Sequence, residues 1–277
     1  MSPVKVHPMV GAEMKAPEGY WTAGAKGTAN LLKTFVTTPR SKWLTMPIPA
    51  FLIEHPEQGP VLIDTAFDPI VATDRKQSFG RVGAAMFAPE KIRPVSDQLR
   101  ERGIEPGDVK TVVMTHLHFD HASGIGQFPG AEFVVEAREW EAASKGGLRD
   151  GYFPQHLAPA KHVRKVDVAA APPADGFEHV LDVFGDGSVR MAFTPGHTHG
   201  HCSILLETAS GPLLLTGDAA YARRAIDERW EPVIIGGDKA DYHHSVEQLA
   251  GWIAAHPGAP VVCGHDAWNP DDVRRDY

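Results

Sequence analysis

Short apolar runs separated by glycine- and proline-containing turns recur along the chain and predict β-strands. Residues 48–54 and 61–64 are two such runs, and the turn residues between them predict a hairpin. A helical pattern at 95–102 ends at Gly103 and leads into an apolar run at 111–114, which predicts a β-α-β step. Further strands are predicted at 132–135, 179–183, 189–194, 203–207, 212–215 and 260–263, those from 179 to 215 as an antiparallel run.

Two other segments have the composition or periodicity of helices. Residues 137–145 are rich in helix formers and end at a glycine pair, and residues 241–255 carry an apolar stripe. We therefore expect an α/β (α+β) fold in which the strands form the middle layers and the helices lie outside them. We expect one domain over residues 1–277, with an irregular N-terminal arm at about 11–47 and irregular, pocket-forming inserts at about 65–94 and 146–175, the first a long loop with room for a short helix. Residues 61–65 and 213–218 are weakly alike.

The strand predicted at 111–114 leads directly into four potential metal ligands. His116 and His118 alternate, so in an extended backbone both imidazoles point to one side, where they can bind one ion. Asp120 and His121 follow a turn and face elsewhere, toward a second ion. A surface histidine cluster or a structural metal clip would explain this run alone, but the chain supplies further ligands.

Three later strands each end at a ligand-type residue, which are His197, Asp218 and His265. A glycine just ahead of each allows a sharp turn while the strand fixes the position of the ligand. Two ions that share one carboxylate need seven protein ligands if a bridging water is to fit. We therefore assign His116, His118 and His197 to the first ion, Asp120, His121 and His265 to the second, and Asp218 as the bridge.

Composition narrows the class of partner. The length of 277 residues and the 43% hydrophobic content allow a sizeable core. The net charge of -8 and the lack of a dense basic run argue against nucleic acid as a partner. Only two cysteines occur, which excludes a disulfide framework. The first eight residues lack the apolar segment of a signal peptide, and no stretch approaches transmembrane length, so we expect a cytoplasmic protein that does not bind membranes.

The run His116-x-His118-x-Asp120-His121, followed by Gly196-His197, Gly217-Asp218 and Gly264-His265, resembles the metallo-β-lactamase superfamily from about residue 48 onward. This resemblance implies a four-layer αββα sandwich with a two-metal hydrolytic site at one edge of the sheets. The bridging aspartate distinguishes the chain from the true zinc β-lactamases. Glyoxalase II and flavo-diiron proteins carry additional C-terminal regions that the short stretch after His265 does not provide, and RNA-processing members act on polyanions, which the acidic charge disfavours.

Within the superfamily, the chain is most similar to the N-acyl homoserine lactonases. The similar segments are residues 47–56, 184–188 and 218–221. In that family a tyrosine three residues after the bridging aspartate lies over the metals and hydrogen-bonds the substrate, and the resemblance gives this role to Tyr221. Two departures occur: His199 and His201 flank Gly200 where the family usually shows proline, and Ala66 replaces a common glycine. We expect both histidines to support ligands or pack, and Cys263 to act as a small buried hydrophobe.

A mechanism follows from metal chemistry. Two Zn²⁺ ions per chain would generate a bridging hydroxide that attacks the lactone carbonyl, although these ligands also accept iron, manganese or cobalt. Tyr221 and one ion would stabilise the oxyanion, and Asp120 would protonate the leaving ring oxygen. We expect an apolar acyl pocket formed by residues of the two inserts, which are Phe67, Phe79, Met86, Phe87, Tyr152, Phe153 and His156.

Other functions stay open at this point. The same hydroxide attacks other lactones, phosphodiesters, phosphotriesters and thioesters, and loops set the specificity. A non-catalytic metal-bearing scaffold that binds a partner through the aromatic residues of 20–43 is a candidate from another class. A homodimer formed through the N-terminal arm is one candidate assembly, and the sequence leaves the oligomeric state open.

Overall fold

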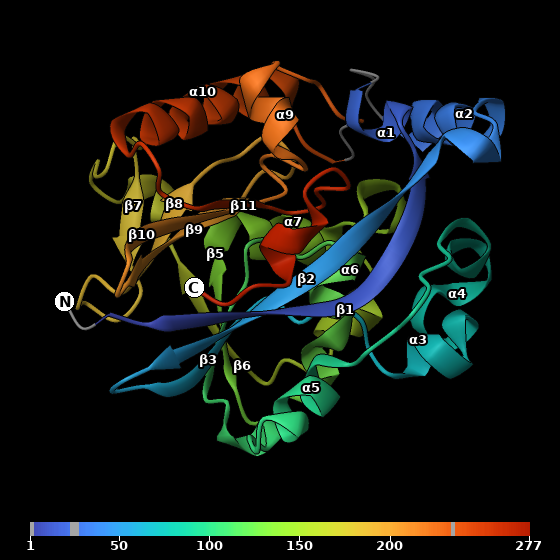
Figure 1. Cartoon of the computed structure of the whole chain (residues 1–277). Helices are drawn as coiled ribbons and strands as arrows, with labels where there is room; N and C mark the ends of the chain where they lie inside the picture. The colour runs from blue at the N-terminus through green and yellow to red at the C-terminus, as the bar shows by residue number, and fades with distance from the viewer. Residues whose placement is uncertain (1–2, 23–27, 234–235) are drawn as a thin grey trace.

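Two β-sheets lie one over the other at the centre of the molecule, and helices cover their outer sides (Figure 1). The computed structural model describes residues 3–22, 28–233 and 236–277. The strand order is β1-β2-β3-β4-β5-β6 in one sheet and β11-β10-β9-β8-β7 in the other. The two-sheet fold with outer helices is therefore confirmed.

The first sheet is antiparallel at one side and parallel at the other. Its strands are β1 (Lys5–Pro17), β2 (Trp43–His55), β3 (Gly59–Ile63), β4 (Thr111–Val113), β5 (Glu132–Glu136) and β6 (His162–Val166). Strands β1, β2 and β3 pair antiparallel, and β3 through β6 pair parallel. The hairpin of β2 and β3 and the crossover from β3 to β4 both follow the sequence prediction.

The second sheet is mainly antiparallel. Its strands are β7 (Val180–Asp182), β8 (Val189–Phe193), β9 (Cys202–Thr208), β10 (Gly211–Gly217) and β11 (Val261–Cys263). Strands β7 to β10 form the predicted antiparallel run, and β11 pairs parallel with β10. The parallel pair brings the ends of β10 and β11 to the same edge of the sheet, where Asp218 and His265 follow.

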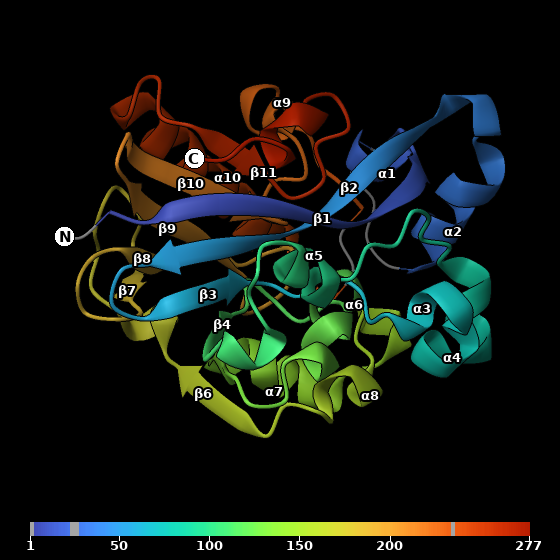
Figure 2. The same cartoon turned by 60° about the horizontal axis from the view of Figure 1, so that its bottom comes forward.

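Helices cover both outer faces of the sheets, and α1 to α4 lie at one end of the molecule (Figure 2). The α-helices are α1 (Gly19–Thr22), α2 (Thr28–Thr37), α3 (Ile70–Thr73), α4 (Arg75–Met86), α5 (Val95–Glu101), α6 (Phe119–Ala122), α7 (Ala137–Lys145), α8 (Pro154–Leu157), α9 (Arg223–Asp227) and α10 (Lys239–Ala255). Short 3-10 helices are η1 (Arg40–Lys42), η2 (Pro106–Asp108), η3 (Ser123–Gln127), η4 (Leu148–Asp150), η5 (Val168–Ala170) and η6 (Pro270–Val273). Helices α5 to α8 cover the first sheet, and α9 and α10 cover the second.

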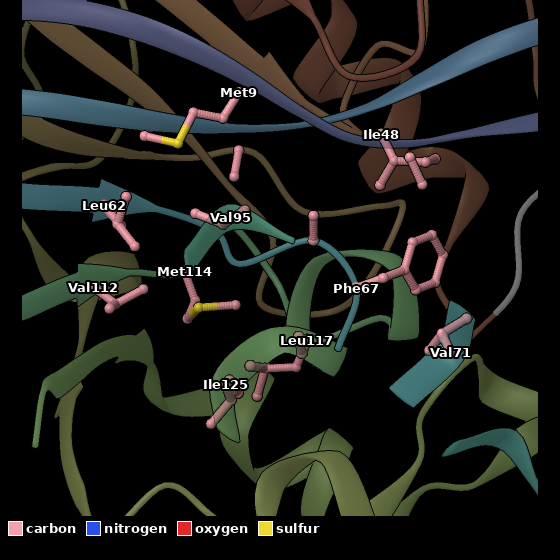
Figure 3. Packing of buried hydrophobic residues seen from close by; sticks show 14 of the residues in the cluster. Met9, Ile48, Leu62, Phe67, Val71, Val95, Val112, Met114, Leu117 and Ile125 are labelled. Atoms are coloured by element: carbon pink, nitrogen blue, oxygen red, sulfur yellow. The ribbon is translucent and has the colours of Figure 1, made fainter. Parts of the chain in front are cut away.

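Alternation along the strands builds the layers. Leu62 on β3 packs toward the helices, whereas its neighbours Val61 and Ile63 pack between the sheets. Figure 3 shows Leu62 with Val112 and other members of the helix-side core. Each fully buried aliphatic side chain contributes about 1.5–3 kcal/mol to the free energy of unfolding. Both faces of β3 are therefore stabilised by burial. The strand is thereby fixed in register beneath the residues that follow it.

Three segments predicted as irregular contain regular structure. Strand β1 extends to Pro17, and α1, α2 and η1 lie between it and β2, so the arm at 11–47 is not irregular throughout. Burial alternates along β1, as from Ala12 to Ala16, but a register shift between Val10 and Ala12 interrupts the alternation. The insert at 65–94 contains α3 and α4, and the insert at 146–175 contains α8 and the edge strand β6. The prediction of irregular structure was wrong for these parts of the arm and of the insert at 146–175, whereas a helix at 65–94 was allowed by the prediction.

Within the described residues, no helix combines the length and apolar character needed to cross a membrane.

Candidate metal centre

The ends of four strands bring all seven predicted ligand residues together. His116 and His118 follow β4, Asp120 and His121 lie in α6, and the remaining three follow β8, β10 and β11. These residues form two buried groups, and within each group the ligand-type atoms all lie within 4.8 Å of one another. The first group is His116, His118 and His197, and the second is Asp120, His121, Asp218 and His265. The arrangement is a dinuclear metal-binding group of residues.

Asp218 lies between the two groups and turns one oxygen to each. Its Oδ2 is 3.3 Å from Nε2 of His197 and 3.7 Å from Nε2 of His116. Its Oδ1 is 3.2 Å from Nε2 of His265 and 3.4 Å from Nε2 of His121. This is the geometry expected of a carboxylate that bridges two cations.

Each of four histidines uses one ring nitrogen for an outer hydrogen bond and turns the other toward the centre. His118 Nε2 lies 2.9 Å from the carbonyl oxygen of Asp150, and His265 Nδ1 lies 2.9 Å from that of Pro47. A carbonyl accepts only, so those nitrogens carry the hydrogen and the opposite nitrogens face the centre. His116 Nδ1 lies 3.1 Å from the Thr115 hydroxyl.

Asp64 orients the fourth histidine, His121. Its Oδ2 is 2.8 Å from Nδ1 of His121 and accepts a 2.8 Å hydrogen bond from the Thr115 hydroxyl, while Oδ1 accepts from the Thr115 amide. Asp64 follows β3, is 3% exposed and has a positive φ of 58°. Asp64 was not predicted as part of the site, although the weak likeness of residues 61–65 to 213–218 places an aspartate at the end of both strands.

The two groups differ in protonation. Burial and neighbouring histidines hold the pKa values of His116 and His197 well below the usual value, and burial also lowers the pKa of His118. In the second group burial lowers the pKa of His121, but the carboxylates of Asp218 and Asp64 outweigh burial and raise this pKa well above its usual value. Asp218 and Asp120 likewise raise the pKa of His265 to about 10 against the effect of burial. The first group is therefore neutral and the second carries protons.

The residues fit a pair of cations. Nε2 of His121, Nε2 of His265 and Oδ1 of Asp218 are buried and form close ion-pair contacts, but among the described residues none of these atoms has a hydrogen bond of good geometry. Buried polar atoms are normally hydrogen-bonded, and three such atoms that face one another suit a common cation. In the other group, Nε2 of His197 lies 2.8 Å from Nδ1 of His118 and 3.2 Å from Nε2 of His116. Three imidazole nitrogens converging on one point form a ligand set suited to zinc and related transition metals.

Glycines allow the close turns that deliver these ligands. Gly196 has a φ of 125°, and a side chain there would place Cβ 2.1 Å from the backbone nitrogen of Tyr242. A Cβ at Gly264 would lie 2.4 Å from Oδ1 of Asp218. The predicted role of glycine ahead of each ligand thus has a steric reason at these two positions.

Tyr221 lies over the centre, and a second tyrosine lies against it. The Tyr221 hydroxyl is 3.3 Å from Nδ1 of His197 and 3.2 Å from the hydroxyl of Tyr20. The two phenol rings are stacked at 8° with centroids 5.1 Å apart. Burial raises the pKa of both phenols, so both are protonated at neutral pH. Sequence analysis missed Tyr20, which comes from a segment with no clear period.

Two further buried residues support the loops. Glu139 accepts hydrogen bonds from the amides of Leu117 and Gly200, and so joins the loops that carry His118 and His197. His201 Nε2 accepts from the backbone amide of Asp218 at 2.9 Å. His201 therefore holds the bridge residue in place instead of facing the centre.

The cavity over the centre has mostly apolar walls. Those walls are Met14, Tyr20, Phe35, Met46, Phe87, Phe119 and Leu148, and Asp120, Asp218 and Tyr221 are among the residues at its polar end. A second cavity of about 320 Å³ shares Met14, Phe35 and Phe87 with it. Lys15, Arg40 and Trp43 also line this outer cavity.

Of the seven residues predicted to line a substrate pocket, Phe87 lines the cavity over the centre. The side chain of Met86 lies outside the described part of the structure. The other five are at most 6% exposed and are not among the residues that line this cavity; they are Phe67, Phe79, Tyr152, Phe153 and His156. Three of them contact the ring of the wall residue Phe119, and His156 packs against two of those three. Tyr152 packs against His118.

Comparison with known proteins gives a consistent result. A family model described as the metallo-beta-lactamase superfamily matches residues 45–265. The chain is 37% identical over 233 residues to the N-acyl homoserine lactonase AttM of Azorhizobium caulinodans, covering 80% of this chain and 84% of that protein. It is 37% identical over 236 residues to AttM of Agrobacterium fabrum, with the same coverage. A variant of B. thuringiensis AiiA, solved with N-decanoyl-L-homoserine bound at the active site, superposes with a TM-score of 0.76 at 24% identity, covering 96% of this chain and 94% of that one.

Proposed function

The chain belongs to the metallo-β-lactamase superfamily, and on this basis we propose that it is a dinuclear metal-dependent hydrolase that opens the lactone ring of N-acyl homoserine lactones. The observation that carries the proposal is Asp218, whose two oxygens each face one cluster of ligands. Tyr221 beside that bridge and the apolar cavity above it supply the other parts of a lactone site. The identity to the AttM lactonases over 80% of the chain supports the choice of substrate.

We propose that His116, His118 and His197 hold one ion and that Asp120, His121 and His265 hold the other, with Asp218 bridging. The convergence of the buried imidazole nitrogens and carboxylate oxygens of these residues supports this set. Nitrogen and carboxylate ligands favour Zn²⁺, and iron, manganese or cobalt suit the same set. When bound, such a pair of cations lowers the pKa of a water molecule and stabilises negative charge on the ester oxygens.

Tyr221 and Asp120 supply the proton chemistry of the reaction. Because burial keeps Tyr221 protonated, its hydroxyl can donate to the substrate carbonyl oxygen as negative charge develops there. A single well-placed donor of this kind contributes about 3–4 kcal/mol to the transition state. Water adds to the carbonyl carbon, the ring C–O bond breaks, and the water proton returns to the ring oxygen through the Asp120 carboxylate. The product is the open-chain hydroxy acid.

The apolar cavity is the proposed site of the acyl chain. Its walls include Met14, Phe35 and Phe87, and the outer cavity extends past the same three residues. Each methylene that enters should raise kcat/KM by up to about fourfold, from about 0.8 kcal/mol of buried surface. A series from butanoyl to dodecanoyl homoserine lactone tests this dependence. Phe35→Ala should flatten it, whereas the control Val82→Ala, at a residue 62% exposed, should not.

A substrate panel tests the activity itself. It contains N-acyl homoserine lactones, simple γ- and δ-lactones, a phosphotriester, lactoylglutathione and a cephalosporin. We expect the highest kcat/KM on the N-acyl homoserine lactones and a fall of about 100- to 1000-fold in kcat for Tyr221→Phe. Hydrolysis confined to the phosphotriester, the thioester or the cephalosporin would contradict the proposal, and a metal-loaded protein without any hydrolysis would favour a binding scaffold.

The remaining expectations concern the whole molecule. The core that both sheets share supports a single domain over the described residues. Association through the N-terminal arm stays a prediction, supported by Val36, which is 82% exposed on α2. Light scattering during gel filtration measures the mass directly.

A further inference from the structure

Tyr20 lies against the proposed catalytic tyrosine without a role in the mechanism above. The two residues are 201 positions apart in the chain, and their hydroxyl oxygens are 3.2 Å apart. Their rings are nearly parallel, with an interplanar angle of 8°. Both residues line the cavity over the centre together with Asp120 and Asp218. Tyr20 is therefore a polar group in the site itself.

The backbone around Tyr20 is held from several directions. Its carbonyl oxygen accepts a 3.0 Å hydrogen bond from the amide of Val233. The next residue, Trp21, is 1% exposed, and its indole donates to the carbonyl oxygen of His265 at 3.2 Å. Phe35 packs edge-on against the Tyr20 ring with centroids 6.3 Å apart. The Tyr20 hydroxyl is thus fixed relative to Tyr221 and to the end of β11.

Counting hydrogens at the Tyr221 oxygen gives the direction of each bond. A phenol has one hydrogen to donate and two lone pairs to accept with. His197 turns Nε2 to the centre, so its Nδ1 carries the hydrogen and donates to the Tyr221 oxygen. If Tyr20 also donates, both lone pairs of Tyr221 are used, and its own hydrogen is left for the cavity. Two donors to one hydroxyl oxygen also strengthen the bond that this hydroxyl donates.

We propose that Tyr20 is a positioning residue for lactone hydrolysis, whose hydroxyl donates to the Tyr221 oxygen and so directs the single Tyr221 hydrogen at the substrate carbonyl oxygen. The inference rests on the proposed function and deepens it. It concerns residues outside the ligand set, because Tyr20 contacts the centre through Tyr221.

Tyr20→Phe tests the proposal, because it keeps the stacked ring and removes the hydroxyl. We expect kcat and kcat/KM for N-hexanoyl homoserine lactone to fall together by roughly 3- to 10-fold, as for the loss of one neutral hydrogen bond felt in the transition state. In a Tyr221→Phe background the same substitution should have no further effect. Tyr242→Phe is the matched control, because Tyr242 is a buried tyrosine whose hydroxyl donates to the carbonyl oxygen of Trp230 and is not among the residues that line the cavity, and it should leave kcat unchanged.

Two readouts other than turnover separate positioning from packing. Metal content and Tm of Tyr20→Phe should match those of the parent protein. Its affinity for the non-hydrolysable N-hexanoyl homoserine lactam should fall by roughly 2- to 10-fold, and again not in the Tyr221→Phe background. Tyr20→Leu, which removes ring and hydroxyl together, should lower kcat no further than Tyr20→Phe.

Equal losses from Tyr20→Phe in both backgrounds, or a much larger loss for Tyr20→Leu, would overturn the proposal and assign Tyr20 to packing. Unchanged kcat and lactam affinity in Tyr20→Phe would also overturn it. Failure of the proposed function gives a different result, since the parent protein would then hydrolyse no homoserine lactone or would not depend on Tyr221.

Discussion

Replacing Asp64 by asparagine should weaken metal binding without touching a proposed ligand. Oδ1 of Asp64 accepts from the Thr115 amide, and asparagine keeps that bond if its carbonyl oxygen takes this place. The amide nitrogen then replaces Oδ2, beside the Thr115 hydroxyl and Nδ1 of His121. The Thr115 hydroxyl can rotate and accept a hydrogen bond from this amide nitrogen. His121 can accept one at Nδ1 only if its hydrogen moves to Nε2, the nitrogen that faces the centre.

The expected effect follows from the one bond that is lost. A hydrogen bond to a charged group contributes about 1.5–3 kcal/mol, and outer partners of metal-binding histidines contribute about 10- to 100-fold in metal affinity. We therefore expect the dissociation constant of the ion at His121 to rise by about 10- to 100-fold. The positive φ of Asp64 is a conformation that asparagine tolerates, so backbone strain does not confuse the result.

A competition titration with a chelator of known affinity measures both dissociation constants of the metal-depleted protein. Asp182→Asn is the matched control, since Asp182 accepts hydrogen bonds from the amides of Phe184, Gly185 and Gly187 in a turn distant from the ligands along the chain. It should leave both constants unchanged. If folded Asp64→Asn protein also kept both constants, the proposed control of the His121 tautomer would be refuted.

Three further predictions follow from protonation and steric contacts. His121 and His265 hold protons in the metal-free protein, so metal binding at their site should release about two protons, whereas binding at the other site should release almost none. Calorimetry at pH 7.5 in buffers of different ionisation enthalpy measures this release. Equal release at both sites would contradict the difference in pKa. Burial lowers the pKa of His156 to about 4, so the unfolded state binds more protons below pH 6.5, and stability should fall by up to about 3 kcal/mol from pH 6.5 to 4. Urea unfolding of His156→Gln should lack this component, and an identical pH dependence in both proteins would argue against it. Gly264→Ala would place Cβ 2.4 Å from Oδ1 of Asp218 and should reduce bound metal toward one ion per chain, measured by elemental analysis; two retained ions would show that Asp218 can shift without loss.

The proposed ligand residues could be found from the sequence because each follows a short apolar strand and lies next to a turn. His116 and His118 carry their spacing locally, and His197, Asp218 and His265 each have a glycine close ahead in the chain. Their convergence follows from the topology, since β3, β4 and β5 pair parallel and β10 pairs parallel with β11. A local pattern was therefore enough to find these residues. The structure adds which carboxylate oxygen or imidazole nitrogen of each residue faces the centre.

The outer partners were not predictable from local patterns. Asp64 contacts His121 because β3 lies next to β4, and Tyr20 meets Tyr221 across 201 residues. The residues predicted to line the acyl pocket illustrate a related limit. Phe79 and Phe153 are aromatic residues in segments read as loops, and core packing and pocket walls use the same residue types. Only three-dimensional neighbours distinguish the supporting ring from the ring that borders the cavity.

The most direct test is a titration of metal-depleted protein with Zn²⁺ while the ring opening of N-hexanoyl homoserine lactone is followed. The account predicts that the lactone is converted to the open-chain hydroxy acid, that activity rises as the second ion binds, and that Asp218→Ala abolishes both the second binding event and the activity. Full activity with a single ion, or two bound ions with no ring opening, would contradict it.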